Sequence, residues 1–184
     1  MVAVLSSDHE SITGLLSDPV LTAEDEHGDA AREQLVAEMV RHFVAEEQYL
    51  FPTVREQVPG GEDLAKSEVT RDRECEKQLR LLEDDDINTD QLAAVLVAVR
   101  ASFARHVQDQ VALFAALEQH CDPATLAQLG EGVLGAEQLA PTRPRHIAPT
   151  SAGANKVTSL VTGFIDQVRD YYTKRGIDPD TADG

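Results

Sequence analysis

The sequence predicts an all-α fold, an up-down four-helix bundle with one or two additional C-terminal helices. Leu, Val and Ala dominate the apolar residues, and aromatic residues make up 4% of the 184 positions. Apolar residues recur every three to four positions through most of the chain, which is the period of an amphipathic helix. No segment shows the strict alternation expected of a half-buried strand. The length suffices for one domain with a substantial core.

Four long helices follow from this periodicity. We expect them at about 2–17, 29–58, 62–84 and 90–120, with a polar, acidic loop between the first two. Pro52 should kink the second helix, because proline has no N–H to donate to residue 48. Pro59, Gly60 and Gly61 should end that helix. Thr89 is the expected N-cap of the fourth helix.

The C-terminal third of the chain predicts two further elements. Asp122 and Pro123 are typical of the N-cap and first residue of a helix. We therefore divide the chain into a bundle with a short fifth helix (1–139), a Pro-rich linker (140–153), and an amphipathic helix with a tail (154–184). We expect that last helix to pack on the bundle or on a second copy of the chain, so the protein is a monomer or a homodimer.

Charge and composition exclude several partner classes. The formal net charge is −17, from 33 acidic and 16 basic side chains. Such a surface repels phosphate backbones and anionic lipids, so we expect neither nucleic acid nor membrane as a partner. No apolar segment approaches the ~18 residues of a membrane span. The N-terminus lacks a basic region before an apolar run, and Cys75 and Cys121 make no disulfide framework. We therefore expect a cytoplasmic protein.

Ionisable residues fall within the apolar stripes of all four long helices. They are His9, His42, Glu46, Asp72 and His106. Burying a carboxylate without a partner is costly, so a shared cation is expected at their level. His42 and Glu46 are four residues apart and therefore share one helical face. Imidazole with carboxylate suits iron, manganese or zinc.

Each of these residues could also have a purely structural role. A single histidine on an apolar stripe is more often a packed core residue than a ligand, so the metal prediction depends on the whole set. His27, His120 and His146 lie in a loop, near a helix end and in the linker, and we expect them at the surface. A buried Asp72 without a partner would destabilise the bundle. It should therefore bind metal or pair with Arg73, Arg71 or another base at the rim of the bundle.

Two motifs resemble those of a known family. Asp8-His9-Glu10 and the run from Arg41 to Pro52 resemble the hemerythrin HHE cation-binding pattern. Residues 139–144 and 154–156 resemble the tail of an actinobacterial subgroup of this family. The resemblance covers nearly the whole chain. It implies a His on helix one, His-x-x-x-Glu on helix two, a His on helix three and a second His-x-x-x-Glu on helix four.

The sequence departs from that pattern on two helices. Asp72 stands where the resemblance implies the third-helix His, and His106 is followed four residues later by Gln110 instead of Glu. Counting back from Leu113 and Phe114, as in helix two, places Asp109 at the glutamate position. Asp109 or Gln110 could ligate, and we favour Asp109 for its charge. The expected metal ligands are therefore His9, His42, Glu46, Asp72, His106 and Asp109.

The resemblance also implies a cofactor and a chemistry. We expect non-haem iron, two oxo- or carboxylate-bridged ions or one ion, that reacts with dioxygen, hydrogen peroxide or nitric oxide. A carboxylate-rich ligand set favours higher oxidation states, which points toward oxidase, oxygenase or peroxide-consuming, catalase-like activity. The alternative is a degenerate single-metal or metal-free helical bundle that acts as a sensor or binding module.

Overall fold

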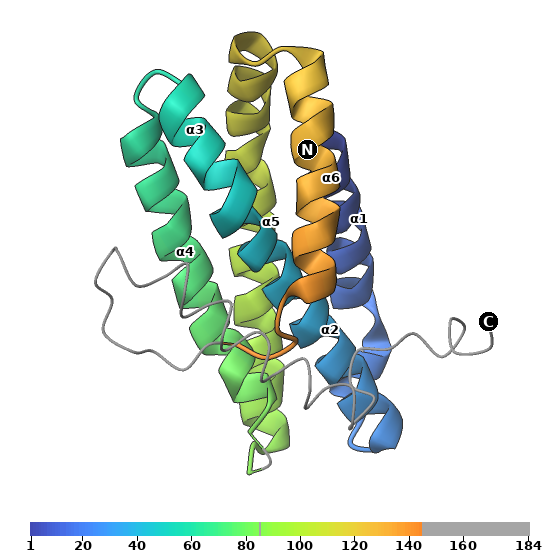
Figure 1. The fold of residues 1–184 in the computed structure, drawn as a ribbon. Helices are drawn as coiled ribbons and strands as arrows, with labels where there is room; N and C mark the ends of the chain where they lie inside the picture. The colour runs from blue at the N-terminus through green and yellow to red at the C-terminus, as the bar shows by residue number, and fades with distance from the viewer. Residues whose placement is uncertain (85, 145–184) are drawn as a thin grey trace, which may run out of the picture.

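The computed structural model describes residues 1–84 and 86–144, and every regular element within them is helical (Figure 1). The elements are α1 (Val2–Ser17), η1 (Pro19–Thr22), α2 (Glu26–Ala45), η2 (Glu46–Leu50), α3 (Phe51–Gln57), α4 (Gly61–Leu82), α5 (Thr89–His120) and α6 (Pro123–Leu139). The predicted all-α bundle is confirmed. The predicted C-terminal helix with its tail (154–184), and the linker beyond residue 144, lie outside the described residues.

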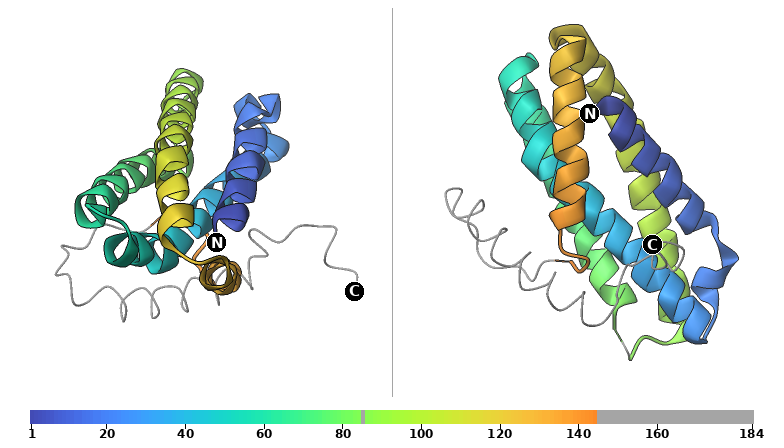
Figure 2. Two further views of the ribbon diagram at one scale, coloured as in Figure 1. Left: turned by 90° about the horizontal axis from the view of Figure 1, so that it is seen from above. Right: turned by 45° about the vertical axis from the view of Figure 1, so that its right-hand side comes forward.

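Consecutive long helices run in opposite directions. In Figure 1, α1 descends, α2 rises with α3 above it, α4 descends and α5 rises. Seen from above, α1 and α2 lie on one side of α5, with α4 on the other (Figure 2). Helix α6 descends again and packs against α1 and α2. The short connections force neighbours in sequence to be antiparallel neighbours in space, as in other up-down bundles.

Side-chain caps set the helix starts. Helix α2 begins earlier than predicted, because Asp25 accepts hydrogen bonds from the backbone N–H groups of His27 and Gly28 at 3.1 and 3.0 Å. The N-cap of α5 is Asn88, which forms a reciprocal capping box with Gln91, so the prediction of Thr89 was wrong by one residue.

Pro52 interrupts the second long helix through a wider turn. Five residues, Glu46–Leu50, adopt a π-helical turn, in which the Phe51 N–H donates to the Glu46 carbonyl. This wider turn accommodates Pro52, which has no N–H to donate within a helix, and α3 follows it directly. The predicted interruption is therefore found, and it begins at Glu46 itself.

Two apolar clusters fill the bundle, one above and one below a polar layer. The upper cluster includes Leu5, Leu50, Phe51, Val54, Leu113 and Leu117. The lower cluster includes Ile12, Leu35, Met39, Phe43, Leu79, Leu96 and Phe103. Along α1, His9 stands between Leu5 of the upper cluster and Ile12 of the lower one. Because apolar packing holds both ends, the polar layer is fixed at one depth in all four helices.

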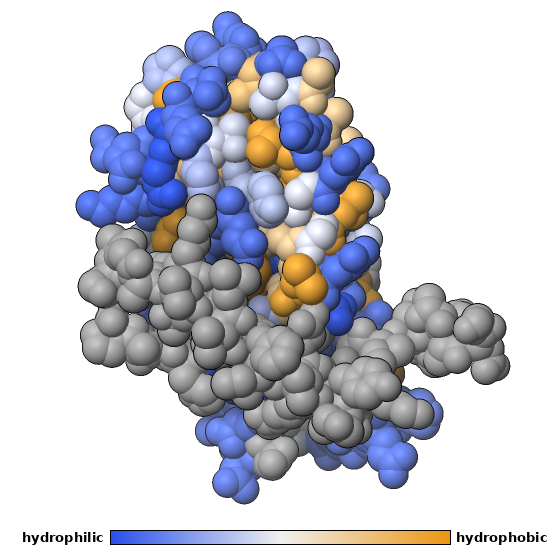
Figure 3. All heavy atoms as spheres, viewed as in Figure 1, coloured by the Kyte–Doolittle hydropathy of each residue, from blue (hydrophilic) through white to orange (hydrophobic). Residues whose placement is uncertain are grey.

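The surface over α6 mixes both kinds of residue. Figure 3 shows hydrophobic residues among hydrophilic ones there, and Leu134 and Leu139 are exposed. None of the helices in the described part of the chain combines the length and apolar character needed to cross a membrane.

Candidate metal centre

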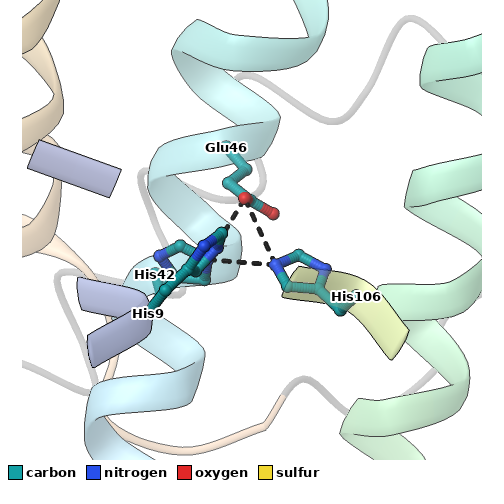
Figure 4. A group of neighbouring side chains, drawn as sticks. All are labelled: His9, His42, Glu46 and His106. Atoms are coloured by element: carbon teal, nitrogen blue, oxygen red, sulfur yellow. Dashed lines mark hydrogen bonds and ion pairs between the residues drawn. The ribbon is translucent and has the colours of Figure 1, made fainter. Parts of the chain in front are cut away.

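Four side chains meet in the polar layer: His9 of α1, His42 of α2, Glu46 of η2 and His106 of α5 (Figure 4). Each offers one donor atom, and these atoms all lie within 4.8 Å of one another. The Nε2 atoms of His42 and His106 are 3.2 Å apart. Glu46 Oε1 lies 3.1 Å from the first of these atoms and 3.5 Å from the second. All four residues are buried.

The second long helix contributes two of the four donors. His42 and Glu46 are one helical turn apart, so both point to the same interior point. Glu46 is also the first residue of the π-helical turn. Single π-helical turns are frequent at functional sites, because they shift the direction of one side chain relative to a regular helix. The π-helical turn therefore begins at the residue that supplies the carboxylate of the cluster, while the spacing of Glu46 from His42 is that of a regular helix.

The cluster fits a transition metal ion. His9 Nε2 and Glu46 Oε2 are buried and make no hydrogen bond. Buried polar atoms are nearly always satisfied, so these two atoms, which lie in the cluster of converging donors, are available to a metal ion. Three imidazoles with one carboxylate suit iron, manganese or zinc. The residues present can therefore hold a metal cation.

A carboxylate lies behind each of two imidazole rings. Asp8 Oδ2 is 3.5 Å from Nδ1 of His42, and Asp72 Oδ1 is 3.2 Å from Nδ1 of His106. Both pairs are within ion-pair distance, and none of the four atoms makes a hydrogen bond. A carboxylate in this position favours the proton on Nδ1 and leaves the Nε2 lone pair available to a metal.

The structure does not bring two of the predicted ligands into the cluster. Asp72 is buried on α4, but it contacts the far side of the His106 ring. Asp109 lies at the edge of the bundle, where Arg71 donates a hydrogen bond to its carboxylate at 2.8 Å. The inward-facing residue is Gln110, whose amide donates to Glu46 Oε1 at 2.6 Å. Asp109 was preferred for its charge. Position 110, however, is one helical turn beyond His106 and therefore lies on the same inward face of the helix.

Two further buried acids on α4 were missed at the level of sequence. Glu68 and Glu76 lie four residues before and after Asp72, and all three are buried. Arg71 forms an ion pair with Glu68 as well as with Asp109. The four-residue spacing from Asp72 was the signal that could have identified both acids.

The electrostatics of the cluster couple its imidazoles to its carboxylates. Burial, together with His42 and His106, lowers the pKa of His9 to about 3. Burial opposes protonation of His42 and His106, but Glu46 and the carboxylate behind each ring outweigh it and raise their pKa values to about 9 and about 10. Burial also opposes ionisation of Glu46, but the two imidazoles outweigh it and lower its pKa. A metal ion that binds here must displace protons.

Aromatic rings enclose the histidines. The Phe103 ring stacks on His106, with centroids 5.5 Å apart. The Phe114 ring stacks on His9 at 5.7 Å, and the Phe43 ring lies 5.6 Å from that of His106. These rings keep the surroundings of the cluster apolar, which strengthens electrostatic interactions with a bound ion.

The remaining histidines lie elsewhere. The His27 side chain is 84% exposed, and His120 is exposed at the end of α5, as expected. His146 lies outside the described residues. The histidines that the structure brings together are therefore the three predicted from the apolar stripes.

Comparison with known proteins agrees with this geometry. The family model described as hemerythrin HHE cation binding domain matches residues 1–122. No curated protein and no solved structure matches the chain. The matched range contains all four residues of the cluster and the whole of α1 to α5. The chain belongs to the hemerythrin HHE cation-binding domain family.

Proposed function

We propose that this protein binds non-haem iron through His9, His42, Glu46 and His106, and that the iron reacts with dioxygen, hydrogen peroxide or nitric oxide. The observation that carries the proposal is the convergence of three imidazoles and one carboxylate within 4.8 Å in a buried layer. Family membership supports a cation at this place. Among the metals that this donor set suits, zinc has no redox chemistry, and the resemblance to the family favours iron.

The surroundings of the cluster support a small ligand. The four side chains are at most 6% exposed, so a bulky substrate has no direct access to them. The rings of Phe43, Phe103 and Phe114 limit water near the donors. Bound iron would supply an open coordination position and one-electron redox chemistry. The protein holds the donors at fixed separations and excludes water, which protects a reactive centre from side reactions.

Enzymatic turnover is the finer part of the proposal. Oxidase, oxygenase or peroxide-consuming activity would need the small molecule to be converted and released. A protein that binds the molecule without turnover would instead act as a carrier or a sensor. Both roles use the same cluster. An enzyme would consume many equivalents of oxygen or peroxide per equivalent of protein, whereas a carrier or sensor would not.

The test uses the full chain loaded with iron(II) under anaerobic conditions. We expect absorption changes on mixing with nitric oxide, oxygen or peroxide, and no change for protein that was never given iron. Glu46→Ala serves as a matched control, because it removes one donor from the cluster while leaving both apolar clusters intact. A chain that takes up no iron, or whose bound iron is inert to all three molecules, contradicts the proposal.

A further inference from the structure

We propose that this protein holds one metal ion per chain. The acidic groups on the α4 side of the cluster orient a metal-binding histidine or pair with an arginine, and they do not bind a second ion. This inference rests on the proposed function, because it concerns the same site. It decides between the one-ion and two-ion alternatives that the sequence left open.

The converging donors are sufficient for one ion. Within residues 1–84 and 86–144, the cluster of His9, His42, Glu46 and His106 is the one group of three or more His, Cys, Asp or Glu side chains whose donor atoms come this close together. Four donors are a complete tetrahedral set, and they leave room for a small ligand on a five- or six-coordinate ion. A second ion would need a second group of donors.

Asp72 does not start such a group. Its carboxylate faces Nδ1 of His106, while Nε2 of the same ring faces Glu46 and His42. One imidazole cannot present Nε2 to the cluster and also turn Nε2 toward Asp72. The position of Asp72 matches that of Asp8 behind His42, so the two carboxylates act alike. Both orient an imidazole that binds the ion, which makes Asp72 a positioning residue.

Arg71 pairs with two other acids beside the cluster. Its guanidinium donates to Glu68 and, at 2.8 Å, to Asp109, so one positive charge bridges α4 and α5 beside the cluster. A divalent cation among these carboxylates would have to displace the guanidinium or tolerate its repulsion. The charge that a second metal ion would supply on this side is therefore already supplied by Arg71.

Gln110 also favours one metal ion over two. Its side-chain nitrogen donates to Glu46 Oε1, so the amide is oriented by the carboxylate of the first site. A neutral amide cannot neutralise a second cation as a carboxylate would. The hydrogen bond also fixes the Glu46 carboxylate, which leaves Oε2 as an oxygen without a hydrogen-bond partner. Gln110 thus supports the donor set for one ion.

The experiment is an anaerobic titration of the full chain with cobalt(II), followed through its visible absorption, and a parallel iron(II) loading with iron measured by plasma mass spectrometry after desalting. We expect both to saturate at one ion per chain. Saturation at two ions overturns this inference and leaves the proposed iron function intact. Binding of no ion overturns both.

Two variants test the separate roles of the acids. Asp72→Asn should keep one ion per chain but weaken cobalt(II) affinity by roughly 10–100-fold, because an amide orients His106 less well. Asp109→Asn, three residues beyond His106 on the same helix, should match the unsubstituted chain in both stoichiometry and affinity. A fall from two ions to one in either variant would identify a second metal site. If Asp72→Asn does not fold, the stoichiometry of the unsubstituted chain still decides.

Discussion

Nδ1 of His106 lies 3.2 Å from Oδ1 of Asp72, on the side of the ring away from the cluster. The Nε2 atom of the same ring faces Glu46 at 3.5 Å. The imidazole is therefore held between two carboxylates from different helices, one behind it and one beside the proposed metal position. This arrangement explains how an aspartate can be buried on α4 without being a ligand, and it recurs on α1, where Asp8 lies behind His42.

Asp8 should support metal binding without belonging to the ligand set. Asp8→Asn removes the charge behind His42, so we expect metal affinity to fall by roughly 10–100-fold while the stoichiometry is unchanged. Isothermal titration with cobalt(II) measures both quantities. Glu10→Gln is the matched control, because Glu10 is exposed on the same helix. Equal affinities for Asp8→Asn and the unsubstituted chain would show that the carboxylate does not orient His42.

His42 and Glu46 should be required for iron binding. Alanine at either position removes a donor from a buried cluster, so we expect iron after anaerobic loading and desalting to fall to a small fraction of the unsubstituted level. His27→Ala should retain full iron content, because this histidine is exposed far from the cluster. Equal iron content in all three variants would place the metal site elsewhere.

The sequence predicted most of the fold because the stripes are long and regular. The periodicity of α1, α4, α5 and α6 predicted their bounds within about two residues. The cap of α5 was misplaced because Asn88 and Thr89 are both good N-caps. Asn88 has Gln91 three residues later and forms a capping box with it, and this local signal would have selected Asn88. The interruption at Pro52 was predicted, but its π-helical form was not, because that form depends on how the upper cluster holds Leu50 and Phe51.

The site was predicted in part. Three histidines and Glu46 were found because each interrupts an apolar stripe, and this pattern is visible in one dimension. The pairing of Asp109 with Arg71, which lies on another helix, is a long-range contact that the sequence does not reveal. The same holds for Asp72, whose burial was predicted but whose contact with Nδ1 of His106 depends on the rotation of α4. The ligand roles themselves stay predictions.

Phe103 should be important for stability as well as for the site. Its ring is buried in the lower cluster and stacks on His106, so Phe103→Ala should lower the free energy of unfolding by about 3–5 kcal/mol. Val97→Ala on the same helix is the control. Val97 is 63% exposed, so its loss should change the free energy by no more than about 0.5 kcal/mol. Urea unfolding followed by circular dichroism measures both, and similar values for the two variants would contradict the packing described here.

The cap of α6 should make stability depend on pH. Asp122 accepts hydrogen bonds from the Thr125 hydroxyl and backbone N–H, and these bonds lower the pKa of its carboxyl below the ordinary value. The folded state thus favours the ionised form. The stabilisation is fully present above the pKa of an unfolded aspartate, about 3.9, and is lost as pH falls through the lower pKa of the folded state.

The variant Asp122→Ala should therefore be less stable than the unsubstituted chain at neutral pH, and the difference should shrink as the carboxyl is protonated. Urea unfolding at pH 7 and at pH 3 gives the two differences. Asp122→Asn keeps a capping oxygen that does not titrate, so its stability relative to Asp122→Ala should not show this loss. A difference between Asp122→Ala and the unsubstituted chain that is as large at pH 3 as at pH 7 would contradict the role of the ionised cap.

X-ray absorption spectroscopy of the iron-loaded chain tests the central claim most directly, because it reports the atoms around the metal itself. Binding by His9, His42, Glu46 and His106 predicts nitrogen and oxygen neighbours with the outer-shell scattering of three imidazole rings. The imidazole contribution should fall by about one ring in His9→Ala wherever that variant retains iron. A spectrum with sulfur neighbours, or with no imidazole scattering, would contradict binding at this cluster.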